Sequence, residues 1–191
     1  MARPSFDETF MDICRTMARR TTCPRRAVGA VIVKENHVLT TGYNGAPKGF
    51  PHPIEVGCIR EELGIPSGEY SDVCPCLHAE QNAIVQAATF GVSVRDGTLF
   101  CTTQPCMSCA RMVINAGIRK IVFEHAYADP LSVGLLTTAG VELFQWDPAS
   151  KRSTRLEGAN TFQQAQAAFK EKYLLKLTKP KPRAKSALAK P

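Results

Sequence analysis

The stretch CPCLHAE (residues 74–80) places a possible metal ligand at every second position. In a strand these four side chains would share one face, whereas in a helix His78 and Glu80 would lie about 200° apart. The apolar residues that follow recur at helical spacing until Gly91 ends the pattern. We therefore predict a helix over residues 78–90, so that the two cysteines of the stretch precede the helix and face elsewhere.

Helical and strand patterns alternate on both sides of this helix. The helices are predicted at residues 6–19, 78–90, 105–116, 130–139 and 159–175, and the strands at 27–34, 37–44, 97–102, 120–123 and 141–146. Residues 45–77 hold five Pro and five Gly, which predicts an irregular excursion. The alternation indicates an α/β fold, a three-layer α/β/α sandwich with a central sheet of about five strands.

The composition is that of an ordinary globular protein, with 44% apolar and 21% charged residues. We find no apolar run long enough to cross a bilayer, and the N-terminus does not resemble a secretory signal. We therefore expect a reducing cytoplasmic location. In that compartment eight cysteines, several of them spaced C-x-C or C-x-x-C, favour metal or redox chemistry over disulfides.

The net charge of +7 comes mainly from the C-terminal end of the chain. Residues 176–191 contain six Lys or Arg and no acid, which leaves 18 basic and 17 acidic groups in residues 1–175. We predict a single domain over residues 1–175 and a disordered basic tail over 176–191. The nearly neutral body argues against a specific nucleic-acid-binding face, although the tail could contact polyanions non-specifically.

A second group of ligand residues lies at the start of the next predicted helix. Cys106 and Cys109 follow Pro105 and are three residues apart, so their sulfurs fall on one helical face near the N-terminal dipole, which favours thiolates. Together with His78 they form a set of nitrogen and sulfur ligands that suits a catalytic Zn²⁺ and leaves its fourth position open. Glu80 could then move protons to and from the reacting groups.

Each motif alone has a plainer interpretation. A lone C-x-x-C is also typical of a thioredoxin-like redox pair or of half a zinc ribbon, and a lone H-x-E is uninformative. The combination is more specific, because each motif opens a predicted helix and a strand lies between them. H-x-E followed by P-C-x-x-C is the known signature of zinc nucleobase deaminases.

The chain resembles the deoxycytidylate (dCMP) deaminases of the cytidine deaminase superfamily. The resemblance rests on the segments CPRRAVGAVIV, TGYNGAPKGFPH, VGCIRE, LHAEQNAI and QPCMSCARMVINAGIRKIV. It implies a hydrolase that converts dCMP to dUMP and ammonia, supplies dUMP for thymidylate synthesis, and commonly forms a hexamer.

The resemblance also implies residues that bind the substrate. Asn44 is similar to the residue that contacts sugar and base, Ala79 belongs to the substrate-binding motif, and Tyr127 resembles an aromatic side chain that closes over the nucleotide. The alternative for Asn44 is a turn residue with positive φ before Gly45, and for Tyr127 it is packing at the sheet edge.

Regulation by nucleotides is a further implication. Many members of the family are activated by dCTP and inhibited by dTTP, each with Mg²⁺, at a second site near the GYNG loop. The residues of this chain near that loop that could hold a triphosphate are Arg25, Arg26, Gly45 and Lys48. Ordinary surface solvation is the alternative explanation for these basic side chains.

Related deaminases often carry a second, structural zinc that ties the excursion to the body. Four thiolates would make a closed site that stabilises without catalysing. The candidate ligands here are Cys23, Cys58, Cys74 and Cys76. Many relatives have a cysteine where this chain has Pro53, so His52 or Cys76 could replace that ligand. The alternative is that the cysteines of the C-x-C pair are free thiols.

Two competing functions remain at the level of sequence. One is deamination of another cytosine or adenine compound, including adenosine in tRNA, although the nearly neutral body and the insertion before residue 78 disfavour an RNA substrate. The other is a zinc-stabilised nucleic-acid-binding module without catalysis, but a structural zinc site would be expected to have four protein ligands.

Overall fold

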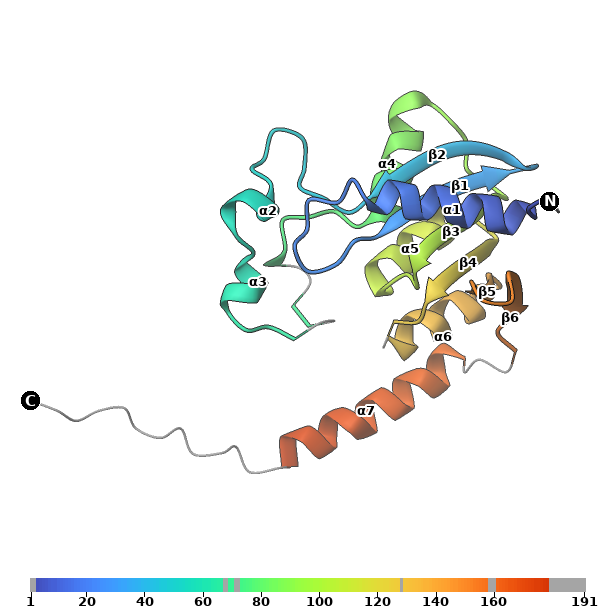
Figure 1. Ribbon diagram of the computed structural model, residues 1–191. Coiled ribbons are helices and arrows are strands. Elements are labelled where there is room, and N and C mark those ends of the chain that lie inside the picture. The colour runs from blue at the N-terminus through green and yellow to red at the C-terminus, as the bar shows by residue number, and fades with distance from the viewer. Residues whose placement is uncertain (1–2, 67–68, 71–72, 128, 158–160, 179–191) are drawn as a thin grey trace, which may run out of the picture.

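The protein is described by a computed structural model over residues 3–66, 69–70, 73–127, 129–157 and 161–178. A mixed six-stranded sheet forms its centre, with strand order β2-β1-β3-β4-β5-β6 (Figure 1). The strands are β1 (Gly29–Lys34), β2 (His37–Tyr43), β3 (Thr98–Thr103), β4 (Lys120–His125), β5 (Glu142–Asp147) and β6 (Arg152–Arg155). The helices are α1 (Phe6–Ala18), α2 (Pro53–Val56), α3 (Ile59–Glu62), α4 (Ala79–Phe90), α5 (Met107–Asn115), α6 (Pro130–Thr138) and α7 (Phe162–Thr178).

Helices cover both faces of the sheet, with α1 on one side and α4, α5 and α6 on the other (Figure 1). Successive side chains of a strand point to opposite faces. Val31 of β1 therefore packs in a buried cluster with Phe10 and Met11 of α1, whereas Ile32 packs in the other cluster with residues of α4 and α5. The predicted three-layer α/β/α sandwich is confirmed.

The structure adds details that the sequence did not predict. The sheet, predicted to have about five strands, has a sixth, because β6 is a short, mostly exposed edge strand of polar residues that has no apolar pattern to reveal it. The last helix, predicted over residues 159–175, is observed over Phe162–Thr178. The rest of the predicted tail, from residue 179, lies outside the described residues. Among the described helices, none combines the length and the apolar character of a membrane span.

The topology brings several chain ends to one edge of the sheet. Strands β3 and β4 run parallel, so both end at this edge, and β1 begins there because it pairs antiparallel with β3. The N-termini of α4 and α5 lie at the same edge, since each of these helices runs back across the sheet face (Figure 1). Side chains at these ends can therefore meet, as ligand sites in α/β sheets generally require.

The excursion between β2 and α4 is partly helical, since it contains α2 and α3, and to that extent the prediction of an irregular segment is wrong. Its two ends are joined, because Gly45 and Leu77 exchange both backbone hydrogen bonds, at 3.1 and 2.9 Å. Contacts with the segment before β1 anchor its middle: the Ile54 amide donates to the Thr22 carbonyl at 3.1 Å, and the Arg25 guanidinium donates to the Ile65 carbonyl at 2.7 Å.

Candidate active site

His78, Cys106 and Cys109 form a compact group of metal-ligating atoms. Both sulfurs lie 3.3 Å from Nδ1 of His78, and they lie 3.8 Å from each other. Tetrahedral Zn²⁺ with ordinary bond lengths would separate two thiolates by about 3.8 Å, and a thiolate from an imidazole nitrogen by about 3.5 Å. The three side chains therefore fit a zinc ion without rearrangement, and their predicted convergence is confirmed.

The ligands lie at helix starts, and the helices begin later than the sequence predicted, by one residue for α4 and by two residues for α5. His78 is the N-cap of α4, and its own amide donates to Oε1 of Gln81 at 2.8 Å. Cys106 is the N-cap of α5, and the helix begins at Met107 rather than at Pro105. Both N-cap residues have extended backbones, which direct their side chains out of the helices and towards the space between the two N-termini.

The electrostatics of this group favour a bound cation. Hydrogen bonds from Cys109 and then from His78 lower the pKa of the Cys106 thiol to about 4, although partial burial opposes the shift. The hydrogen bond to Cys106 in turn raises the pKa of His78. A thiolate at a helix N-terminus next to an imidazole is the form of cysteine that metals require.

Glu80 lies beside these ligands and is almost fully buried, with 3% of its surface exposed. Burial raises the pKa of its carboxyl, and the neighbouring His78 partly opposes the increase. The carboxyl also hydrogen-bonds with Cys109. A buried carboxyl with a raised pKa next to a three-ligand metal site is suited to accept and return protons.

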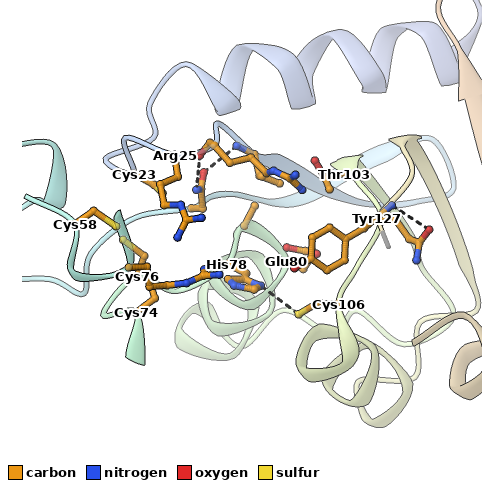
Figure 2. A pocket seen from close by; sticks show the side chains of 16 residues that line it. Cys23, Arg25, Cys58, Cys74, Cys76, His78, Glu80, Thr103, Cys106 and Tyr127 are labelled. Atoms are coloured by element: carbon orange, nitrogen blue, oxygen red, sulfur yellow. Dashed lines mark hydrogen bonds between the residues drawn. The ribbon is translucent and has the colours of Figure 1, made fainter. Parts of the chain in front are cut away.

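One cavity contains most of the residues singled out from the sequence, and Figure 2 shows their side chains around His78 and Glu80. The predicted residues that line it are Cys23, Arg25, Arg26, Asn44, Cys58, Cys74, Cys76, His78, Ala79, Glu80, Cys106 and Tyr127. Cys109 is buried behind this surface. His52, Gly45 and Lys48 do not line the cavity, and Gly45 instead pairs with Leu77.

Asn44 joins the cavity to the segment that precedes β1. Its Oδ1 accepts from the Val28 amide and from Oγ1 of Thr21, both at 2.8 Å, and its Nδ2 donates to the Arg26 carbonyl at 2.7 Å. Its backbone does not have positive φ, so the alternative of a left-handed turn residue is wrong. Asn44 holds in place the chain that carries Arg25 and Arg26.

Tyr127 lies across the cavity from the cysteine-rich side (Figure 2). The guanidinium carbon of Arg26 lies 5.3 Å from the centroid of its ring, within the range of a cation–π contact. The Tyr127 amide donates to Oε1 of Gln104 at 3.3 Å. Partial burial raises the pKa of the phenol. Tyr127 therefore faces the cavity rather than merely packing at a sheet edge.

Several lining residues were missed from the sequence. Val28 directly precedes β1, Thr103 ends β3 and Gln104 follows it, whereas Arg60 comes from α3 in the excursion. Gln104 directly precedes the P-C-x-x-C motif and could have been found by its position. No sequence signal distinguishes Arg60 from other exposed basic residues, because it reaches the cavity only through the path of the excursion.

Three arginines therefore line this cavity, and among the described residues no carboxylate forms an ion pair with them. Arg60 donates to the carbonyls of Pro66 and Glu69 at 3.2 and 2.6 Å. Nε of Arg60 and Nη1 of Arg25 are both buried, and neither has a hydrogen-bond partner among the described residues. The cavity thus combines uncompensated positive charge with unused donors, which favours an anionic ligand.

The four remaining cysteines of the cavity gather on one side of it, away from Tyr127 (Figure 2). Burial, followed by the neighbouring thiols of Cys74, Cys23 and Cys58, raises the pKa of Cys76 to about 12. Within the described residues, however, only the His78 group has three ligand atoms that all lie within 4.8 Å of one another. The second metal site therefore stays a prediction.

Comparison with known proteins places these motifs in a family context. The family model described as "Cytidine and deoxycytidylate deaminase zinc-binding region" matches residues 4–125. The deoxycytidylate deaminase of Schizosaccharomyces pombe is 40% identical over 147 residues, which cover 76% of this chain and 45% of that protein. That of Mycobacterium phage D29 is 37% identical over 128 residues, which cover 64% of this chain and 97% of the phage protein.

The fold comparison points the same way. The crystal structure of a cyanophage S-TIM5 dCMP deaminase in complex with dCMP and dUMP matches with a TM-score of 0.60 and 30% identity, over 76% of this chain and 99% of that one. The chain spans less than half the length of the deoxycytidylate deaminases of Schizosaccharomyces pombe and Saccharomyces cerevisiae that it matches, at 45% and 46%.

Proposed function

The chain belongs to the cytidine and deoxycytidylate deaminase family, and on that premise we propose that it catalyses the hydrolytic deamination of dCMP to dUMP and ammonia. The observation that carries the proposal is the three-ligand metal group with the buried Glu80 beside it, inside a cavity that arginines line. A purely structural metal site would be closed by a fourth protein ligand. The binding-module alternative is therefore disfavoured.

His78, Cys106 and Cys109 would hold the zinc ion, which when bound supplies Lewis acidity for the hydrolysis. Glu80 would accept one proton from the attacking water and deliver it to N3 of cytosine. It would then take the second proton of that water from the new hydroxyl at C4 and deliver it to the amine, which departs as ammonia. Its burial keeps bulk water from competing for these protons.

We assign recognition of the 5′-phosphate to Arg25, Arg26 and Arg60. A phosphate monoester carries a charge close to −2 at neutral pH and offers several acceptor oxygens, which matches three guanidinium groups that form no ion pair among the described residues. A neutral nucleoside would leave these groups without a negatively charged partner. The cavity is thus better suited to a nucleoside monophosphate than to deoxycytidine, and Asn44, Ala79 and Tyr127 would line the sugar and base.

The test is the loss of cytosine absorbance from dCMP, measured beside deoxycytidine, CMP and a transfer RNA. We expect turnover of dCMP, and much weaker turnover of deoxycytidine. Arg60→Ala should raise KM for dCMP at least 10-fold and leave the residual rate on deoxycytidine unchanged, since a charge-assisted contact contributes about 1.5–3 kcal/mol. Equal turnover of nucleoside and nucleotide by the unmodified protein would contradict the assignment, and preferred turnover of tRNA would favour the other deaminase class.

Regulation by dCTP and dTTP with Mg²⁺, a hexameric assembly and a cytoplasmic location also belong to the proposal. None of the eight cysteines, all of which lie in the described part of the chain, forms a disulfide, which is compatible with a reducing compartment. Arg25 and Arg26 line the substrate cavity, so an effector held by them would compete with dCMP, whereas one held near Gly45 and Lys48 would not. Initial rates at several concentrations of dCMP and dTTP separate these two patterns of inhibition.

We further propose that Cys23, Cys58, Cys74 and Cys76 hold a second, structural zinc that ties the excursion to the body. The mutual proximity of their thiols supports this proposal, and Cys76 rather than the exposed His52 is the better replacement for the ligand missing at Pro53. Metal analysis should find two zinc ions per chain, and Cys58→Ser should leave one. One zinc in both proteins would instead mean free thiols.

A further inference from the structure

The carboxylate of Asp129 lies between the first turns of two helices. Its Oδ2 accepts a hydrogen bond from the Met107 amide at 2.9 Å, and its Oδ1 accepts from the Ser132 amide at 3.1 Å. Met107 is the first residue of α5, and Ser132 lies in the first turn of α6. One side chain therefore caps both helices and fixes their N-termini relative to each other.

Helix α5 needs this external acceptor. The first amides of a helix have no partner within the helix, and the side chain of the N-cap residue usually supplies one. In α5 the N-cap residue is Cys106, which makes no side-chain capping bond because its sulfur faces His78 and Cys109. Asp129, 22 residues after Met107, supplies the missing acceptor. The negative charge is also favourable at two helix N-termini.

The same network holds the backbone of Tyr127. The Tyr127 amide donates to Oε1 of Gln104 at 3.3 Å, and the Tyr127 carbonyl accepts from the Asp129 amide at 2.7 Å. Oγ of the fully buried Ser132 donates to the Asp129 carbonyl at 2.8 Å. Gln104 directly precedes the P-C-x-x-C motif. The two groups that hydrogen-bond with the Tyr127 backbone are the Gln104 side chain and the Asp129 amide. Both therefore belong to residues that also contact the start of α5 or α6.

We propose that Asp129 is a positioning residue that sets the Cys106–Cys109 pair and the Tyr127 ring in one fixed arrangement. Its carboxylate accepts hydrogen bonds from the backbone amides of Met107 and Ser132, so that it acts through the backbone at the starts of α5 and α6 and through its own amide bond to Tyr127. The part of the proposal that concerns nucleotide binding rests on the proposed function. The part that concerns metal retention does not.

The first test measures metal retention in Asp129→Ala and in Asp147→Ala, without any substrate. Asp147 is a matched control, since it accepts backbone hydrogen bonds from Ala149 and Ser150 at 3.0 and 3.2 Å in an exposed turn. Residues that orient metal ligands change metal affinity by about 10–100-fold. We expect Asp129→Ala to lose zinc to a competing chelator at about a tenth of the concentration that the unmodified protein requires, or less, and Asp147→Ala to match the unmodified protein. Equal retention in all three proteins would overturn this half of the proposal.

The second test is a double-mutant cycle with Tyr127→Ala, read as KM for dCMP. If Asp129 positions the tyrosine, the increase in KM that Asp129→Ala causes should largely disappear in the Tyr127→Ala background. Additive effects would mean that Asp129 only stabilises the fold. If Asp129→Ala does not fold, Asp129→Asn replaces it: an amide can accept one of the two hydrogen bonds but not both, so intermediate effects are expected. If the unmodified protein does not turn over dCMP, the proposed function fails while the chelator experiment still decides the metal half.

Discussion

Replacement of Gly42 by alanine would test how closely α4 is held against the sheet. Gly42 lies in β2, directly beneath the start of α4. A Cβ at this position would lie 2.1 Å from the carbonyl oxygen of Ala79 and 2.7 Å from the amide nitrogen of Ala83. Both are backbone atoms, so no side-chain rotation can relieve the overlap. The overlap would therefore displace Ala79, which lies between His78 and Glu80 in the sequence.

The geometry sets the size of the effect. Ordinary contact with a Cβ begins near 3.4 Å, so the separation from the Ala79 oxygen must grow by about 1.3 Å. Overpacking of this kind costs about 1–3 kcal/mol in the free energy of unfolding. A displacement of about 1 Å at a catalytic group costs on the order of 100-fold in rate. Gly42→Ala should therefore lower the free energy of unfolding by about 1–3 kcal/mol and lower the rate by about 100-fold.

Gly29→Ala is the control, because it creates an equally close contact on the other face of the sheet. Its Cβ would lie 1.9 Å from the carbonyl oxygen of Cys14 in α1. Urea unfolding should show similar losses of stability in both variants. Only Gly42→Ala should also lose zinc content and about 100-fold in kcat/KM for dCMP. Equal losses of kcat/KM in the two variants, or an unchanged kcat/KM in Gly42→Ala, would refute the reasoning.

Three further predictions address single residues. Glu80→Gln should retain zinc but keep less than about 1% of the turnover rate, because the amide cannot carry the proton, and metal analysis beside the absorbance assay checks both halves. Cys109→Ser should lose the catalytic zinc while it keeps the fold, since serine is a poor zinc ligand of similar size, and a full complement of zinc in that variant would contradict the ligand assignment. Ser5→Ala should lower the free energy of unfolding by about 1 kcal/mol, because Ser5 is the N-cap of α1 and its Oγ accepts a hydrogen bond from the Glu8 amide at 3.1 Å. Urea unfolding measures this loss, and an unchanged free energy of unfolding would contradict the capping role.

Much of the candidate metal-ligand group could be predicted from local spacing. Cys106 and Cys109 are three residues apart, and at the start of α5 the N-cap residue and the first turn bring their sulfurs to 3.8 Å from each other. The first residues of α4 and α5 were harder to predict from the sequence. His78 and Cys106 cap these helices with extended backbones that direct their side chains towards the metal-ligand group, and apolar periodicity does not reveal this geometry. The strand β6 escaped prediction because an exposed edge strand of polar residues has no buried face to impose alternation.

The sequence by itself determined the chemistry available to this protein: the ligand types, their order, the carboxyl next to them and the alternation of helices and strands. Only the tertiary structure decided that Arg60 reaches the same cavity as His78, and that Asp129 caps the helix of Cys106. The reason is physical. Periodicity and spacing encode contacts within one or two turns of chain, whereas these two contacts depend on the paths of loops that pack against a finished sheet.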